Sequence, residues 1–158
     1  MNNTEFVYTT YIKSTPDKVW QAITNPEFAT QYWVNKNISD WKKGSEWKHV
    51  SPDGSQTMVT GKVLESNPPK RLVLTWAAPD DLADVSQVSF DIEMVGGLVK
   101  LDVVHNQFKQ GSTMPGKISK GWPLVLCSLK SLLETGKAID IVAVKGPCGA
   151  DGDKSAAA

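Results

Sequence analysis

The feature that most constrains the fold is a pair of alternating runs, "VSQVSFDIEMV" and "LVKLDVVH", joined by Gly96-Gly97. From Val88 to Met94 every second residue is apolar, and the residues between are polar. Two glycines between such runs predict a tight hairpin turn. A strand of about 10 residues reaches about 33 Å, and a sheet of such strands must twist and curl. We therefore predict a curled antiparallel sheet with one face buried in the core and the other exposed to solvent.

A long helical pattern follows the hairpin. Residues 121–136, "GWPLVLCSLKSLLETG", place their apolar side chains on one arc, about 120° wide at roughly 100° per residue. Gly136 predicts the end of this helix, and its start is expected near "PGKISK", residues 115–120. A single helix cannot fill the space enclosed by a curled sheet as completely as a second sheet would. We therefore predict a cavity between helix and sheet.

The rest of the chain completes an α+β pattern. Residues 5–13 are rich in aromatic and β-branched types and predict a first strand. Residues 15–24 and 25–33 each open with a capping residue followed by proline, which predicts two short helices. Further strands are expected at 45–50, 56–65 and 72–76, and an acidic loop at 77–84. The predicted fold is a curved antiparallel sheet of six to seven strands wrapped around a long C-terminal helix.

Composition narrows the function classes. The chain has 158 residues, enough for one ordinary domain, which we place at residues 1–140, with a disordered C-terminal tail at 141–158. Lys plus Arg equals Asp plus Glu at 17 each, and Arg71 is the only arginine, so a nucleic-acid binder is not expected. Two cysteines make no disulfide framework. No signal peptide or membrane span is expected either, and the predicted location is cytoplasmic.

Several segments carry a family resemblance. They are "TPDKVWQAIT" (15–24), "QYWV" (31–34), "GKVLESNPPKRLVLTW" (61–76), "VVHNQF" (103–108) and the helix at 121–136. In this order they resemble the activator-of-heat-shock-protein-ATPase homologue-like branch of the helix-grip superfamily, also called START-like or SRPBCC. Gln107 departs from the family, which more often has Gly between the His and the Phe. The resemblance implies a helix-grip (Bet-v-1-like) fold with a hydrophobic pocket, and small bacterial cytoplasmic proteins presumed to bind apolar molecules. It implies no single reaction.

Two histidines are the sharpest candidates for chemistry. His105 continues the series Leu101 and Val103, which are alternate residues on the inward face of the strand, so its imidazole should face the cavity or lie at its edge. It could act as a general base or orient a ligand, or be a core histidine hydrogen-bonded to the backbone. His49 shares parity with Trp47 and could join it. Two histidines without a patterned carboxylate do not make a metal site, and we expect no metal and no cofactor.

Six tryptophans are many for this length, and most fall where walls of the pocket are expected. Aromatic rings supply large contact areas for flat or greasy ligands, although ordinary core packing would explain each ring taken singly. The predicted ligand-binding residues are Trp33, Trp47, His49, Met58, Trp76, Val88, Phe90, Val103, His105, Trp122, Leu126 and Leu129. No catalytic residue is predicted.

Three functions compete on this evidence. The leading one is a cytoplasmic domain that binds a hydrophobic or aromatic small molecule in the cavity. The second is an enzyme of the cyclase, dehydratase or hydrolase kind that uses a pocket histidine as acid–base. The third, suggested by the family name, is a co-chaperone that stimulates a heat-shock ATPase. Chaperone association is not expected, because the eukaryotic activators carry an additional N-terminal domain that this chain does not show. A homodimer stays open.

Overall fold

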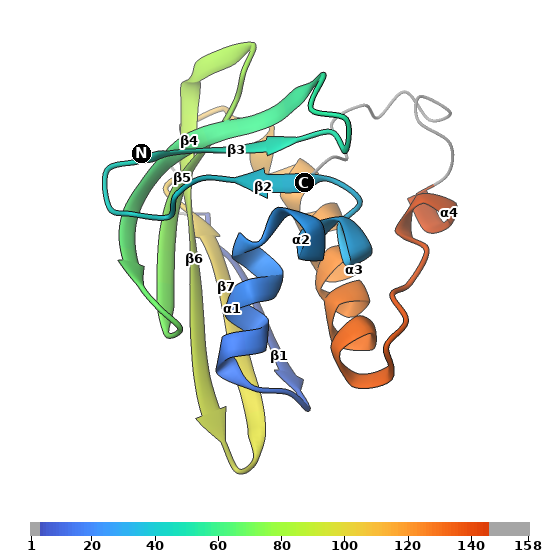
Figure 1. Cartoon of the computed structure of the whole chain (residues 1–158). Helices are drawn as coiled ribbons and strands as arrows, with labels where there is room; N and C mark the ends of the chain where they lie inside the picture. The colour runs from blue at the N-terminus through green and yellow to red at the C-terminus, as the bar shows by residue number, and fades with distance from the viewer. Residues whose placement is uncertain (1–3, 146–158) are drawn as a thin grey trace.

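The computed structural model describes residues 4–145. The elements in chain order are β1 Phe6–Ile12, α1 Pro16–Thr24, α2 Pro26–Tyr32, β2 Lys36–Ile38, β3 Glu46–Val50, β4 Thr57–Asn67, β5 Arg71–Ala78, β6 Asp81–Val95, β7 Leu98–Asn106, α3 Met114–Thr135 and α4 Ile141–Lys145. The predicted α+β order of a strand, two short helices, a run of strands and a long helix is confirmed (Figure 1).

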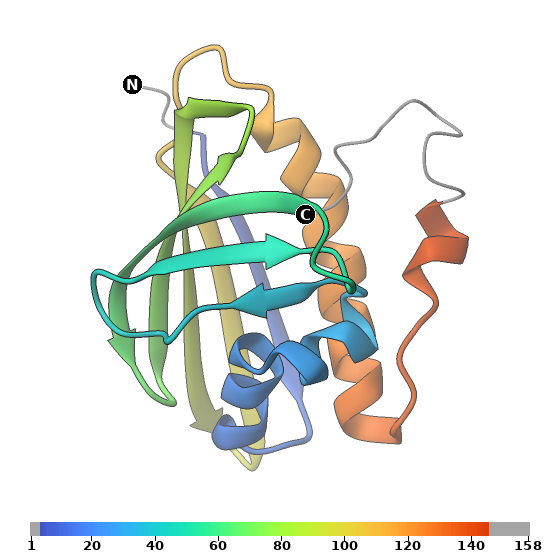
Figure 2. The same cartoon turned by 45° about the horizontal axis from the view of Figure 1, so that its top comes forward.

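The strands form one seven-stranded sheet in the order β1-β7-β6-β5-β4-β3-β2, with every neighbouring pair antiparallel. The register shifts at His49/Val50, Val63/Glu65 and Trp76/Ala78. Such irregularities bend a strand and increase its twist, and all of them lie in the half of the sheet that curls over. Figure 2 shows this half arching toward α2 and α3. The sheet is therefore curved, as predicted, and its hollow face holds the helices.

The hairpin between β6 and β7 is as expected. Val95 pairs with Leu98, and Gly96 and Gly97 between them have φ angles of 58° and 88°. Both values are positive, as a type I′ turn requires at its two central residues. Strand β6 is longer than expected, because it begins at Asp81. The acidic segment predicted as a loop is thus largely strand, and the turn that precedes it is tight.

The two short helices are capped by the residues that the sequence indicates. The Thr15 hydroxyl accepts a hydrogen bond from the backbone N–H of Lys18, and Asn25 Oδ1 accepts from the N–H groups of Glu27 and Phe28. A proline follows each cap, where its missing N–H costs no helical hydrogen bond. Asn25 both ends α1 and caps α2, so it sets the turn between these two helices.

Helix α3 lies on the concave face of the sheet. Gly136 ends it in the left-handed conformation, φ 83°, and its N–H donates to the carbonyl of Leu132. The predicted apolar stripe is buried: Trp122, Leu126 and Leu129 are each at most 3% exposed. The ring centroids of Trp122 and Phe90 are 5.8 Å apart, so the side chain of Trp122 contacts that of Phe90 on β6. None of the helices in the described part of the chain could cross a bilayer.

The end of the described chain departs from the expected disorder. Residues Ile141–Lys145 form α4, and Ile141 is buried. The Ser128 hydroxyl of α3 donates to the carbonyl of Ile139 and accepts from its N–H, which ties the connection to α3. Helix α4 therefore lies within the segment predicted as a disordered tail, and the rest of that segment, 146–158, lies outside the described residues.

Candidate functional site

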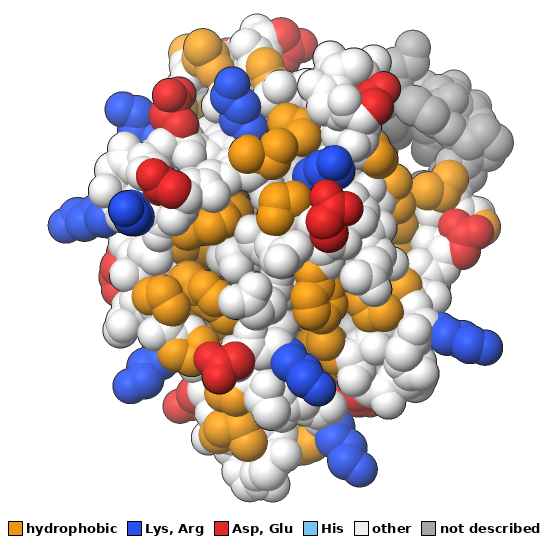
Figure 3. All heavy atoms as spheres, viewed as in Figure 1, with side chains coloured by type: hydrophobic (Ala, Val, Ile, Leu, Met, Phe, Trp, Pro, Cys, Tyr) orange, Lys and Arg blue, Asp and Glu red, His pale blue; other side chains and the backbone are white. Residues whose placement is uncertain are grey.

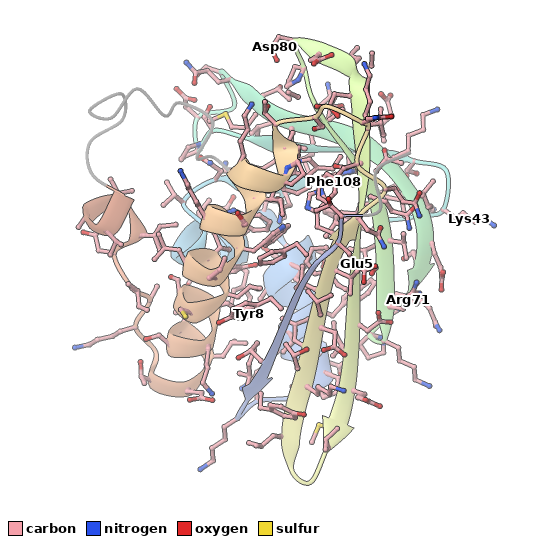
Figure 4. The ribbon with its side chains drawn as sticks, turned by 180° about the vertical axis from the view of Figure 1, so that it is seen from behind. Glu5, Tyr8, Lys43, Arg71, Asp80 and Phe108 are labelled. Carbon is pink, nitrogen blue, oxygen red and sulfur yellow. The ribbon has the colours of Figure 1, made fainter. Side chains whose placement is uncertain are left out.

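The space between the sheet and α3 is occupied by one group of aromatic and histidine side chains, which we call the interior cluster. Its members come from α3, from β3, β5, β6 and β7, and from the turns after α2 and β7. They are Trp33, Trp47, His49, Trp76, Phe90, His105, Phe108 and Trp122. Each is at most 4% exposed. Figure 4 labels Phe108 in the region between the strands and α3.

The tryptophans of the interior cluster contact one another in a row. Ring centroids are 5.4 Å apart for Trp33 and Trp122, 5.4 Å for Trp122 and Trp76, and 5.5 Å for Trp76 and Trp47. Their planes meet at tilted angles, within the range that aromatic pairs favour. The row continues to half-buried Trp41, whose ring lies 6.4 Å from that of Trp47. An aromatic wall therefore runs from the interior to the surface beside the loop after β2.

His105 is held by both of its ring nitrogens. The indole N–H of Trp122 donates to His105 Nδ1 at 3.1 Å, and His105 Nε2 lies 2.7 Å from the hydroxyl of Ser86. Because Nδ1 accepts, the proton of the neutral ring is on Nε2, which donates to Ser86. Burial lowers the pKa of His105 to about 3, so the ring is neutral at pH 7. Its ring also stacks on Phe108 at 5.0 Å.

This arrangement separates the two interpretations of His105. A general base needs a lone pair that points toward the substrate, but the lone pair of His105 already accepts from Trp122. The structure thus supports a positioning role for His105, in which it fixes the orientation of Trp122 on α3. Its partners are side chains rather than the backbone groups expected for a core histidine.

His49 sits at the other end of the cluster, on β3. Its Nδ1 lies 2.7 Å from Asn37 Oδ1, and Asn37 in turn donates through Nδ2 to the carbonyl of Ile23. His49 Nδ1 therefore carries the proton and Nε2 is the acceptor, with Asn35 Nδ2 at 3.4 Å. The ring also packs on Trp33 at 4.6 Å. His49 thus brings an acceptor atom close to the half-buried side chain of Asn35.

Trp33 differs from the other indoles in its hydrogen bonding. Its Nε1 is buried, and within the described residues it has no hydrogen-bond partner. Trp47 and Trp122, by contrast, donate to the carbonyl of Thr75 and to His105. Val34, the next residue, has a φ of 78°, which is rare for a β-branched side chain. A strained turn thus places an unsatisfied donor inside the cluster.

The remaining predicted residues surround the interior cluster. Val88, Val103, Leu126 and Leu129 are buried, and Met58 is partly buried against the same core. The structure therefore brings the whole predicted set together. It packs these side chains against one another, however, and does not leave the open cavity that was expected around them. Val103 and Trp122 are fully buried, and Phe90 is 2% exposed.

Sequence reasoning missed several polar and aromatic members of this site. Ser86 has the same parity on β6 as Val88 and Phe90, so its inward position was available from the alternation. Phe108 was noticed in a family motif but was not assigned to the site, although it stacks on His105. Asn35 and Asn37 lie in and beside a strand of three residues, which is too short to show a pattern.

The other titratable groups lie outside the interior cluster. Arg71 binds both carboxylate oxygens of Asp91 at 2.7 Å and lies 3.3 Å from Glu65, on the face of the sheet that points away from α3 (Figure 4). A hydrogen bond with Cys127, followed by burial, raises the pKa of Tyr8 to about 12. Among the described residues, no three His, Cys, Asp or Glu side chains gather as metal ligands would.

The geometry agrees with what comparisons with other proteins find. A family model described as activator of Hsp90 ATPase homolog 1-like protein matches residues 13–134. No curated protein sequence matches the chain significantly.

Solved structures give the same fold at low sequence identity. The Aha1 dimer from Colwellia psychrerythraea has a TM-score of 0.71 at 23% identity, over 85% of this chain and 99% of that one. An Hsp90 activator from Plasmodium falciparum has 0.69 at 20%, over 82% and 95%. CalU16 from Micromonospora echinospora has 0.67 at 20%, over 84% and 77%. These likenesses establish the helix-grip fold.

Proposed function

The chain belongs to the activator of Hsp90 ATPase homolog 1-like family, and from that premise we propose that it binds a hydrophobic or aromatic small molecule between the sheet and α3. The proposed site is the interior cluster together with Met58, Val88, Val103, Leu126 and Leu129. Its indole rings would supply flat apolar contact area, and its few polar atoms would orient the ligand.

The observation that carries the proposal is the unpaired indole N–H of Trp33. A buried donor without an acceptor costs about 1–3 kcal/mol, and native interiors rarely keep one. A ligand with a carbonyl or ether oxygen near Trp33 would accept this hydrogen bond. We therefore infer a flat, mainly apolar ligand that carries a hydrogen-bond acceptor, of which a flavonoid is a suitable probe.

Binding would require the cluster to open, because its rings contact one another in the structure. The turn from Trp33 to Asn35 is the proposed entrance. Val34 holds a φ of 78° there, and such a conformation costs on the order of 1–3 kcal/mol. Rotation of this turn would relieve the strain and withdraw Trp33 from its contact with Trp122.

Thermal unfolding of the whole chain with fatty acids, flavonoids and sterols tests the proposal. A ligand that binds only the folded state stabilises it by about 2.7 kcal/mol at a hundredfold excess over Kd, so the Tm should rise for at least one class. Trp33→Phe removes the donor and keeps an aromatic ring. It should weaken binding of the active probe about two- to tenfold, whereas Trp41→Phe, outside the interior cluster, should not. No shift with any class, or equal binding by Trp33→Phe, would contradict the proposal.

The other expectations about partners stay predictions that experiments can address. A homodimer would be visible by light scattering from the purified chain. Co-chaperone activity would require association with the cognate heat-shock ATPase at micromolar concentration. A pocket enzyme would have to release a ring nitrogen of His49 or of His105, because the nitrogens of both rings have hydrogen-bond partners within the fold.

A further inference from the structure

A hollow of about 520 Å³ lies on the surface, away from the interior cluster. It is formed by α1, by the loop between β2 and β3, and by the end of β4. Its lining residues are Trp20, Asp40, Trp41, Lys42, Lys43, Ser66 and Pro68. The volume is within the range of about 300–1,000 Å³ that small-molecule sites occupy. This hollow could therefore hold a ligand of one or two fused rings without any rearrangement of the core.

The apolar wall of the hollow is fixed in place. Trp41 has a φ of 60°, a left-handed conformation that is rare for a bulky side chain. Two hydrogen bonds hold it there: its indole N–H donates to the carbonyl of Thr24 at 2.9 Å, and its backbone N–H donates to the hydroxyl of Ser39 at 3.0 Å. The ring also packs against buried Trp47. A ligand would thus meet a rigid aromatic surface, which lowers the entropy lost on binding.

The rim of the hollow is positively charged. Lys42 and Lys43 are exposed, and neither forms an ion pair with another residue between 4 and 145. Figure 4 shows Lys43 extending from this loop into solvent. The one carboxylate in the lining, Asp40, stays ionised, because hydrogen bonds from the Ser45 hydroxyl and the N–H of Lys42, together with the charge of Lys42, lower the pKa of Asp40. Two lysines and one aspartate thus leave the lining with an excess of one positive charge for an incoming anion.

We propose that this hollow binds a planar aromatic carboxylate. The aromatic ring lies against Trp41 and Pro68, and the carboxylate lies at the rim, where the flexible side chains of Lys42 and Lys43 can reach it. The ring contact gives the apolar part of the affinity, and the lysines select the anion over its neutral analogue. Ion pairs exposed to solvent are worth about 0–1 kcal/mol each, so binding is weak and depends on salt.

Nuclear magnetic resonance titration of the whole chain with 2-naphthoate and with neutral 2-naphthamide tests the site. The acid should bind about fivefold more tightly than the amide. The double variant Lys42→Gln, Lys43→Gln should remove this preference, whereas Lys48→Gln, an exposed lysine outside the hollow, should keep it. Raising the NaCl concentration from about 0.05 M to about 0.5 M should weaken binding of the acid and leave binding of the amide unchanged.

A second variant tests the aromatic wall. Asparagine tolerates the left-handed conformation, so Trp41→Asn should keep the backbone of the loop. Because it removes the aromatic wall, it should abolish binding of both the acid and the amide. The proposal is overturned if acid and amide bind equally, or if neither probe binds at millimolar concentration. It is also overturned if the double variant Lys42→Gln, Lys43→Gln and the control Lys48→Gln show the same preference for the acid over the amide. A probe that shifts only the indole signals of Trp33 and Trp122 would likewise overturn it, because the probe would then lie in the interior.

Discussion

His105 shows how burial can turn a titratable residue into a structural one. Its pKa of about 3 lies below the value of about 6.5 that an unfolded chain gives. Between these two pH values the unfolded state binds a proton that the folded state does not. Stability is therefore highest above pH 6.5 and decreases as the pH falls toward 3.

Urea unfolding at pH 7 and pH 5 measures this linkage. The wild-type free energy of unfolding should fall by about 2 kcal/mol between these two pH values, because one proton is worth about 1.4 kcal/mol per pH unit. His105→Gln removes the titrating ring, so its stability, although lower at pH 7, should change less over the same interval. Equal slopes for the two proteins would show that His105 does not carry the effect.

Two tryptophans of similar burial should respond differently to the same substitution. Trp122→Phe leaves His105 Nδ1 without its donor and makes a void, so we expect a loss of about 3 kcal/mol. Trp33→Phe makes a similar void but removes a donor that has no partner, so we expect a loss of about 1 kcal/mol. Chemical denaturation of both variants, without ligand, gives the comparison. A larger loss for Trp33→Phe would mean that its N–H is satisfied in solution.

At the scale of elements, β4 and β5 approach each other closely beside Gly61. A Cβ atom at this position would lie 2.0 Å from the carbonyl oxygen of Thr75 and 2.6 Å from Trp47 Nε1. The glycine thus permits the hydrogen bond between Trp47 and Thr75, 2.8 Å long, which anchors the indole row near its outer end.

Gly61→Ala should therefore destabilise the fold by about 3 kcal/mol or more, because two strands must separate to admit one methyl group. Gly116→Ala is the matched control. Gly116 lies in α3 with nothing near its absent side chain, and alanine there should stabilise the helix by about 0.5–1 kcal/mol. Thermal unfolding distinguishes the two outcomes by sign, and a neutral Gly61→Ala would show that the strands are not packed so closely.

Much of the element structure could be predicted, and the misses have physical reasons. The hairpin of β6 and β7 and the stripe of α3 follow from periodicity, because each element has one buried face. Strand β2 has three residues, and the exposed start of β6 at Asp81 has no alternation to detect. The inward direction of Trp76, Phe90 and His105 could be read from parity, but their mutual contact depends on ring size and rotamer. The sequence therefore predicted which side chains point into the interior, but not that they pack closely against one another.

At the scale of the whole molecule, positive and negative charges are balanced. Positive and negative side chains number 17 each, and Figure 3 shows small apolar groups separated by charged and polar ones on the face in view. A molecule of this kind has little electrostatic repulsion between copies near its isoelectric point, about pH 6.7.

Self-association should accordingly be greatest near pH 6.7 and should decrease on either side. Static light scattering across a pH series measures this. Lys48→Glu, at an exposed position on β3, should move the maximum to lower pH, because it removes one positive charge and adds one negative charge. A maximum that stays in place would point to a specific interface rather than to net charge.

The position of β1 at one edge of the sheet has a consequence for how the protein is made. Its partner in the sheet is β7, and Phe6 lies opposite His105. A ribosome adds about 5–20 residues per second, so β1 waits on the order of 5–20 s for its neighbour to emerge. Contacts so distant in the chain also slow refolding. The first strand is thus the last of the seven strands to gain its partner in the sheet, and the nascent chain is open to aggregation until β7 has been made.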